Sequence, residues 1–435
     1  MSGLFLAHWR QLRPLAKLLS RERARQTLLL YGSELALIAL TLGTGIINSR
    51  FLGPVQYGIY TLVITIVDAI MIFSGFGYPQ AGARVVALAG NPADQRAMHG
   101  ALLLIALAMG AGMSALLALG SPLIALLFHT RQQHCLLVAA ALCSTVPLQL
   151  ILVQSCRGGN RIGVLAMVTM LPKALYLVGA LAVVFWWHLT AQSALLLFYG
   201  GTLAACALAL CCLRVRFANL RGRFREVHAE VRRYGFKAYV GSLADLSTFK
   251  LNNLLIAGYV DVTWLGFYNI AATMVSPMVR FSTSLSSSAF RSLAQRDRLD
   301  KRLVLANAAF LAVSGLAVAL CARAIIRHVL TPQFLPAAGL TYVLAGTAFF
   351  QGLYQPLNAF LAAHGRGREL RAISFSVSVI NLGVAVALIP RFGAYGAAAG
   401  SVVAKGCELL GNAYFYRKIT RQAQQPAIGL RPVRL

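Results

Sequence analysis

Long apolar runs alternate with short polar segments along most of the chain, from residue 27 to residue 414. A helix that crosses a bilayer needs about 20 predominantly apolar residues. Twelve runs approach or exceed that length, so the pattern predicts an all-α integral membrane protein with twelve transmembrane helices. The predicted spans are 27–47, 60–78, 101–119, 135–155, 162–187, 193–213, 236–260, 267–288, 303–322, 340–362, 373–389 and 394–414.

Two pairs of similar segments divide these spans into two sets of six. Arg50–Tyr60, with the sequence RFLGPVQYGIY, resembles Gly258–Tyr268, which lies 208 positions later. The basic, glycine-containing turns Arg157–Arg161 and Ala363–Arg368 are 206 positions apart. An even number of spans per repeat predicts two six-helix bundles related by an axis along the membrane normal, as a parallel repeat. The expected segments are 1–26 (basic, interfacial or cytoplasmic), 27–213 (first bundle), 214–235 (basic cytoplasmic linker), 236–416 (second bundle) and 417–435 (basic cytoplasmic tail).

The composition supports a membrane protein and gives its orientation. Hydrophobic residues make up 58% of the chain and charged residues 12%, about half the charge of a soluble domain. The net charge of +28 would also suit a nucleic-acid partner, but the basic residues lie in the gaps between apolar runs, which argues against that class. Basic loops stay cytoplasmic, and an N-in topology places 31 of the 40 lysines and arginines inside. We therefore expect both termini in the cytoplasm.

Aromatic and cysteine residues add little chemistry to this picture. Aromatic side chains fall at the predicted outer ends of the spans, as an interfacial belt would place them. They are Tyr57, Tyr60, Trp186, Trp187, Tyr259, Trp264 and Tyr268. The eight cysteines lie in or at the ends of apolar runs without a Cys-x-x-Cys pair or a nearby histidine, so no metal site or other cofactor is predicted.

The basic linker between the two repeats has an amphipathic pattern. Residues 214–237 contain eight lysines and arginines, with Phe217, Leu220, Phe224, Val227 and Val231 at near-helical spacing. This pattern favours an interfacial helix held to anionic lipid headgroups. A solvated linker that follows the positive-inside rule is the alternative.

The seventh and eighth predicted spans carry polar side chains that lipid would not tolerate. The eighth contains Arg280 among several serines and threonines. An ionisable group at the centre of a lipid-facing helix costs about 2.5 kcal/mol or more, so both spans are predicted to line an aqueous cavity. The polar residues of the seventh are Ser242, Asp245, Ser247, Thr248, Lys250, Asn252 and Asn253.

Basic residues within the spans outnumber acidic ones and define a candidate cationic cavity. Lysine and arginine are natural partners of phosphate oxygens, so the cavity would suit an anionic ligand. The candidate substrate-binding residues are Arg280, Lys250, Lys173, Lys405 and Asn253.

Salt bridges within the membrane are the structural alternative for these cations. Lys250 could pair with Asp68 or Asp245, whereas Lys405 lies three residues from Glu408 on one helix face. Intramembrane carboxylates also carry ion or proton coupling in many transporters. The candidate coupling residues are Asp68, Asp245 and Glu34.

Three motifs resemble the oligosaccharide flippases of polysaccharide biosynthesis, which belong to the multidrug/oligosaccharidyl-lipid/polysaccharide exporter superfamily. They are Arg50–Tyr60, the following Gly75–Arg84 (GFGYPQAGAR) and, in the second repeat, Leu265–Ala271 (LGFYNIA). The resemblance covers essentially the whole chain. The predicted topology puts the first and third motifs at outer helix ends, where tight turns would form an outward gate. The gate residues would be Arg50, Gly53, Pro54, Gly58 and Gly266.

The resemblance implies transport of an undecaprenyl-diphosphate-linked oligosaccharide across the bacterial cytoplasmic membrane by alternating access. Such transport serves the assembly of O-antigen, exopolysaccharide or capsule. A lipid diphosphate is an anion, in agreement with the candidate cationic cavity. The polysaccharide polymerase, the chain-length machinery and anionic membrane lipids are the expected partners.

A cation-coupled multidrug efflux transporter of the same superfamily is the nearest alternative, although its cavity should be rich in acids. Membrane enzymes fit less well. Polymerases and ligases of this class need a large outside loop, and no predicted outside loop exceeds about fifteen residues. The chain has no Asp-x-Asp triplet and no Walker-type phosphate loop, so we predict no catalytic residues and no ATP hydrolysis.

Reporter fusions test the predicted orientation. A fluorescent protein that matures in the cytoplasm should be active when it is fused near Gly222, whereas alkaline phosphatase should be active only when it is fused near Val262. The reason is that the basic linker stays inside. The reverse pattern of activities would contradict the N-in topology.

Overall fold

The computed structural model describes residues 21–128, 133–296 and 298–422, with all their side chains except those of 21–35, 237–238, 241–249 and 291. This part of the chain is helical and contains no strand. The longer helices are α2 (Arg21–Ser74), α3 (Tyr78–Leu88), α4 (Pro92–Leu127), α5 (Gln133–Leu142), α6 (Thr145–Gly158), α7 (Ile162–Trp186), α8 (Ala191–Leu213), α9 (Leu220–Glu230), α10 (Phe236–Tyr259), α11 (Val262–Ala294), α12 (Lys301–Ile325), α13 (Pro336–Ala363), α14 (Gly367–Phe392) and α15 (Ala394–Gln422). Short π-helical turns η1 (Val231–Gly235) and η2 (Ile326–Leu330) and the 3-10 turn η3 (Pro332–Phe334) complete the elements.

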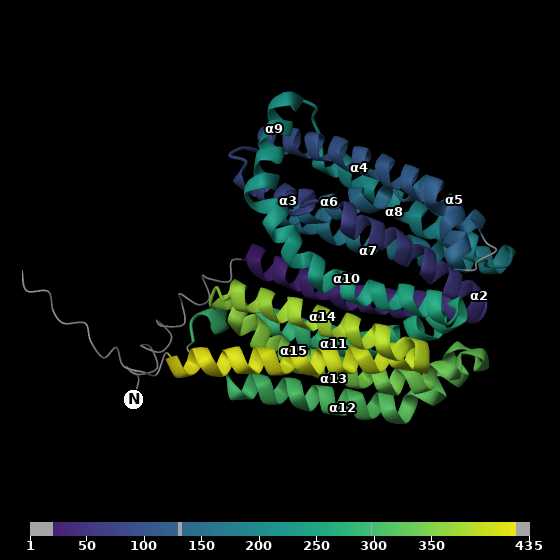
Figure 1. The fold of residues 1–435 in the computed structure, drawn as a ribbon. Coiled ribbons are helices and arrows are strands. Elements are labelled where there is room, and N and C mark those ends of the chain that lie inside the picture. Colours follow the sequence, from purple (N-terminus) through teal and green to yellow (C-terminus); the bar gives the residue numbers. More distant parts are fainter. Residues whose placement is uncertain (1–20, 129–132, 297, 423–435) are drawn as a thin grey trace, which may run out of the picture.

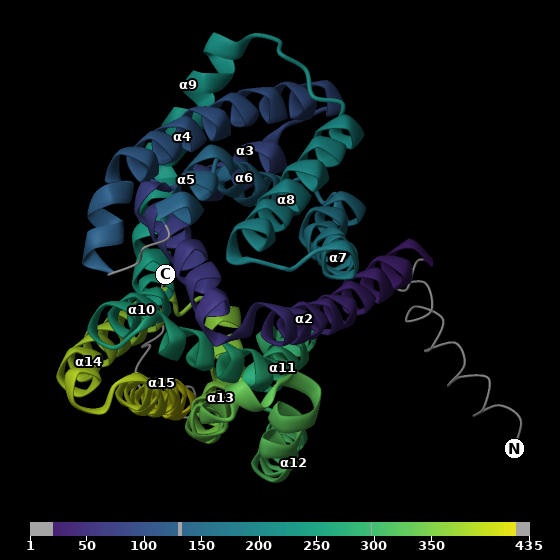
Figure 2. The same cartoon turned by 90° about the vertical axis from the view of Figure 1, so that its right-hand side faces the viewer.

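The helices form two groups with α2 and α10 between them (Figure 1). We call α3 to α9 the N-terminal group and α11 to α15 the C-terminal group. Helix α2 packs on α7 and α8 of the first group and on α11 of the second, whereas α10 packs on α2 and α14. Figure 2 shows α2 running along the boundary between the groups. We call the end of the molecule that carries α9 the α9 end and the opposite end the Gly53 end.

Each of the twelve predicted spans coincides with helix in the structure. The spans 27–47 and 60–78 both lie largely in α2, and 135–155 covers α5 and α6, which are bent by 42°. In the described residues, six helices are long and apolar enough to cross a membrane, or seven if the bent pair counts as one span. Helices α10, α11, α13 and α15 are not among these helices in the described residues. The fold is therefore that of a multi-pass membrane protein, and the count of twelve spans stays a prediction.

Helix α2 changes direction at the motif that marks the repeat. Gly53 has φ 70° and ψ 172°, far from helical values, and only glycine adopts this backbone region without strain. The next residue, Pro54, has no N–H to donate, so it suits the first turn of the helix that follows. The turn predicted between the first two spans is thus a kink within one continuous helical segment.

The two copies of the motif pack directly against each other at the Gly53 end. A methyl group on Gly58 would lie 1.9 Å from the carbonyl oxygen of Val262, and one on Gly266 would lie 2.8 Å from that of Pro54. The backbones of α2 and α11 therefore touch where only hydrogen atoms fit between them. Arg50 adds a second tie, since its guanidinium donates to the carbonyl oxygens of His328 and Leu330 at 3.3 Å.

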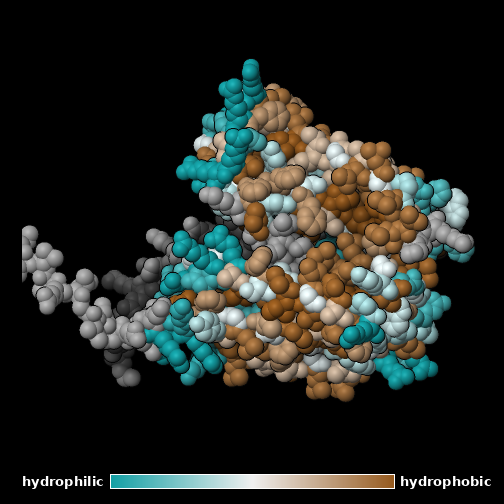
Figure 3. Space-filling model, in the orientation of Figure 1, coloured by the Kyte–Doolittle hydropathy of each residue, from teal (hydrophilic) through white to brown (hydrophobic). Residues whose placement is uncertain are grey.

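The outer surface of the helices is strongly apolar along much of its length. Large hydrophobic side chains such as Leu119, Phe185 and Leu320 are exposed by 84%, 84% and 72%. Figure 3 shows hydrophobic residues over the middle of one face, with hydrophilic residues gathered toward its two ends. Soluble monomers rarely expose apolar patches of this size, so this surface suits the lipid bilayer.

The predicted aromatic belt is only partly correct. Trp186 and Trp187 are exposed by 81%, as a belt residue should be. Tyr57, Tyr60 and Tyr268 are instead buried in the core. Tyr60 packs on Tyr176 and Phe198, Tyr57 packs on Phe334, and the Tyr268 hydroxyl pairs with that of Ser401, so helix packing rather than lipid surrounds these rings.

The basic linker packs part of its apolar face on the N-terminal group. Val227 of α9 and Val231 of η1 are buried in a cluster formed by helices of the N-terminal group. Two ion pairs fasten the same segment: Arg223 with Asp94 of α4, and Glu230 with Arg84 of α3 at 3.1 Å. Val227 and Val231 of the linker therefore pack on the N-terminal group, whereas Phe217 is exposed, and the contact of the linker with lipid stays a prediction.

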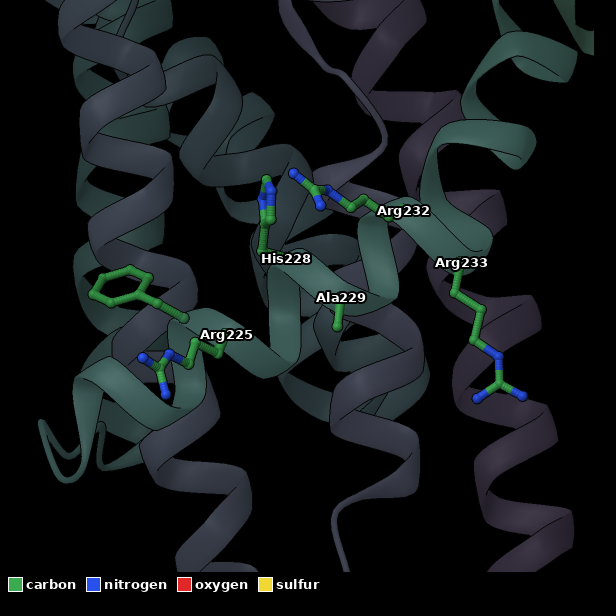
Figure 4. Close-up of a pocket in the computed structure, with 6 residues that line it drawn as sticks. Arg225, His228, Ala229, Arg232 and Arg233 are labelled. Carbon is green, nitrogen blue, oxygen red and sulfur yellow. The ribbon is translucent and has the colours of Figure 1, made fainter.

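Arginines remain on the outside of this docked linker. An open pocket of about 730 Å³ follows α9 and η1, and Figure 4 shows Arg225 and Arg233 pointing away from each other at its ends. This basic surface lies at the α9 end and is open to solvent or to lipid headgroups. Its lining residues are Phe224, Arg225, His228, Ala229, Arg232 and Arg233.

Substitution of Gly58 tests the motif packing. Gly58→Ala should lower the thermal unfolding temperature of the purified protein, because its methyl group overlaps the Val262 carbonyl and overpacking costs about 1–3 kcal/mol. Gly200→Ala is the matched control, since a methyl group there meets no atom within 4 Å. Equal unfolding temperatures for the two variants would contradict the close contact.

Candidate functional site

A cluster of polar side chains lies along α2 where it meets α7, α10 and α11. Its centre is an ion pair in which the Lys250 ammonium of α10 donates to the Asp68 carboxylate of α2 at 2.5 Å. Each side chain is 33% exposed although it lies between packed helices. A charge pair facing hydrocarbon would be costly, so the exposed part of this pair indicates a water-accessible space.

Asn253 extends the cluster one helical turn further along the same face of α10. Its side-chain amide donates to the Thr65 hydroxyl of α2 at 3.3 Å and to the Asn269 side-chain oxygen of α11 at 3.4 Å. Asn253 is 8% exposed, so these hydrogen bonds satisfy a buried amide. This residue therefore holds α10, α2 and α11 together beside the ion pair.

Asn252 does not line the cavity predicted for the seventh span. It is 1% exposed and bonds to two helices of the C-terminal group. It donates to the Ser401 hydroxyl and accepts from the Asn381 amide, both at 3.2 Å. Adjacent residues on a helix point about 100° apart, so Asn252 faces the C-terminal group whereas Lys250 and Asn253 face α2.

Lys173 and Arg280 are two further cations, from opposite groups, near the part of α2 that precedes the Gly53 kink. Lys173 of α7 donates to the Thr41 hydroxyl of α2 at 2.6 Å. The positive charge of Arg280, on α11, acts on the Lys173 ammonium, so the two side chains lie within electrostatic range. Both are half-buried, and the partner of Lys173 is a neutral hydroxyl. An anion that approached both would relieve their mutual repulsion.

Lys405 lies in a different environment from the other candidate cations. Its ammonium donates to the Glu408 carboxylate at 2.6 Å and lies 5.5 Å from the centre of the Tyr354 ring. The side chains of Lys405 and Glu408 are 10% and 8% exposed. These contacts join α15 to α13 within the C-terminal group, which agrees with the structural salt bridge weighed above.

Two of the candidate coupling residues have side chains outside the described part of the structure, namely Glu34 and Asp245. The structure adds three polar residues that sequence reasoning did not single out: Thr41, Thr65 and Asn269. For Thr65 a signal existed, because it precedes Asp68 by three residues on one face of α2. The role of Thr41 depends on the crossing of α2 with α7, which the sequence pattern does not give.

The geometry can therefore do two things. It can bind a negatively charged group through Lys173 and Arg280, and it can exchange the partner of Lys250 between Asp68 and a ligand. The gate candidates Arg50, Gly58 and Gly266 lie away from this cluster, at the Gly53 end, and hold α2 against the C-terminal group. In the described residues no group of three or more His, Cys, Asp or Glu side chains is placed to hold a metal ion.

The fold is shared with transporters of known structure. The lipid II flippase MurJ in an inward closed conformation matches with a TM-score of 0.73 and 12% identity, over 92% of this chain and 90% of that one. A MATE-family multidrug resistance transporter of the MOP superfamily matches in its inward-facing conformation with a TM-score of 0.69 and 14% identity, over 90% and 96% of the two chains. An outward-facing MATE structure gives 0.54 at 13% identity, over 91% and 97%.

The sequence comparisons give a family but no individual relative. No curated protein matches the chain significantly. The model of the polysaccharide biosynthesis protein family matches residues 24–291, which is more than half of the chain and includes the motifs at both Gly58 and Gly266. The fold is that of membrane transporters. The chain therefore belongs to the polysaccharide biosynthesis protein family and has the fold of MOP-superfamily transporters.

Proposed function

We propose that this protein is a lipid-linked oligosaccharide flippase of the bacterial cytoplasmic membrane. It would move undecaprenyl-diphosphate-linked glycan units from the cytoplasmic to the outer leaflet for O-antigen, exopolysaccharide or capsule assembly. The observation that carries the proposal is the placement of Lys173 and Lys250, from two different helices, against α2. Arg280 of α11 lies within electrostatic range of Lys173.

The charge balance favours an anionic cargo. A diphosphate carries the charge that Lys173 and Arg280 would bind, and charge-assisted hydrogen bonds to phosphate are the strong ones. In this proposal the diphosphate displaces Asp68 from Lys250, while the polyprenyl tail stays in the bilayer beside the helix groups. Asp68, released from its partner, would then be available to take up a proton or a cation.

The packing supports an inward-facing starting state for such a cycle. Glycine contacts and the Arg50 tie close the Gly53 end, which the charge rule predicts to face outside. The higher TM-score to the inward-facing than to the outward-facing MATE structure agrees with this orientation. Rocking of the groups would then have to separate Gly58 from Val262 and free Arg50 from His328.

Deletion of the gene tests the proposed function directly. Surface polysaccharide should disappear and lipid-linked repeat units should accumulate on the cytoplasmic side, measured by glycan blotting and lipid extraction. A plasmid copy should restore export. Unchanged polysaccharide together with increased sensitivity to cationic drugs would overturn the proposal in favour of the multidrug efflux transporter of the same superfamily.

Arg280→Ala tests the cationic cluster within that function. Export should fall at least about tenfold while the protein level in the membrane is unchanged, because a charge-assisted hydrogen bond to the cargo is lost. Arg280→Lys should retain part of the activity, since it keeps the charge. The matched control is Arg323→Ala, which removes an exposed arginine in the last turn of α12. Full export by Arg280→Ala would remove this residue from the site.

A further inference from the structure

A second group of arginines lies at the α9 end of the N-terminal group, apart from the cluster on α2. Arg96 of α4, Arg161 at the start of α7 and Arg214 at the end of α8 line a pocket of about 300 Å³. Cavities of this size bind small ligands. Lys173 lies twelve residues after Arg161, which is about 18 Å along α7. The arginine pocket is therefore distinct from the proposed transport site.

The backbone fixes the three arginines in place. Arg214 closes α8 in a left-handed conformation, with φ 48°, and turns the chain toward α4. Two residues later the amide of Arg216 donates to the carbonyl oxygen of Arg96 at 3.1 Å. The segment that follows α8 thus lies along the first turns of α4. The pocket is formed by helix ends and does not depend on a flexible loop tip.

The positive charge of this pocket is not balanced by the described part of the chain. Arg96, Arg161 and Arg214 form no ion pair among the described residues. The carboxylates nearby are already committed, since Asp94 and Glu226 pair with Arg223, and Glu230 pairs with Arg84. Guanidinium groups that line one small cavity repel each other, and an anion between them would remove that repulsion.

Further donors lie beside the three guanidinium groups. Helix α7 begins without a side-chain cap, and Val164 of its first turn lines the pocket. The first amides of a helix have no partner within it and favour an anion. The amides of this first turn therefore lie beside the uncompensated charge of the arginines.

We propose that this arginine pocket binds a phosphate group. Guanidinium forks match phosphate oxygens in geometry as well as in charge. The phosphate belongs either to the headgroup of an anionic membrane lipid or to a soluble phosphate. Next to the pocket, Cys212 and the 59%-exposed Phe217 present apolar surface, which favours the lipid headgroup. A bound phosphate would connect the start of α4 with the start of α7 and the end of α8.

Binding to the purified full-length protein tests this proposal. Calorimetry measures the affinity of the detergent-solubilised protein for two ligands at constant ionic strength. They are inorganic phosphate and dihexanoyl phosphatidylglycerol. Nanodiscs of phosphatidylcholine with one tenth phosphatidylglycerol provide a second measurement, as lipid retained in native mass spectrometry. Arg96→Gln, Arg161→Gln and Arg214→Gln should each weaken binding about tenfold, the size of one charge-assisted hydrogen bond. A single elution peak confirms that each variant is folded.

The control removes three charges, more than any single pocket variant, from the same end of the molecule. The control is a triple variant in which exposed arginines of the linker are replaced: Arg221→Gln, Arg225→Gln and Arg233→Gln. Arg225 and Arg233 border the open pocket of Figure 4. This variant should bind phosphate as the parent protein does. If dihexanoyl phosphatidylglycerol displaces inorganic phosphate from the protein, the pocket is a lipid headgroup site. If inorganic phosphate binds and the lipid does not compete with it, the pocket is a soluble phosphate site. Absence of binding, or equal loss in the pocket and control variants, would overturn the proposal.

Discussion

The contact between the backbones of α2 and α11 at Gly58 and Gly266 is the constraint on which the rest of the structure depends. It holds the two helix groups together at one end of the molecule, with Arg50 as an additional tie. Because the groups are joined there, α2 can run along both of them and present its polar face to α7, α10 and α11. The candidate site exists because α2 packs on both helix groups.

The polar residues along that boundary have divided roles. Asn253 satisfies its amide between three helices and stabilises the crossing, whereas Asp68 and Lys250 keep one third of their side-chain surface exposed. A fully buried pair is costly to separate, and a fully exposed pair contributes little. An intermediate pair can exchange partners at modest cost, which is what a cargo that must bind and leave requires.

Much of this arrangement could be predicted from the sequence, for identifiable reasons. Helices occur at all twelve apolar runs because length and apolarity specify them locally, and Lys405 pairs with Glu408 because three residues on a helix bring side chains together. The docking of α9 could not be predicted, because an amphipathic face looks the same whether lipid or protein covers it. The arginine pocket was also hidden, since Arg96 and Arg214 are 118 positions apart and meet only through tertiary packing.

The start of α10 limits how the two groups can move. Gly77, in the turn after α2, approaches Gly235 so closely that a methyl group on it would lie 2.3 Å from that residue's backbone. The Tyr239 hydroxyl donates to the Phe73 carbonyl oxygen at 3.0 Å. Because α9 also packs on α3 and α4, the segment that leads into α10 is held on the N-terminal group. The other end of α10 contacts α14 of the C-terminal group through Asn252. A rigid separation of two independent bundles would break these contacts. Motion that opens the Gly53 end must therefore pivot on α10 or bend it.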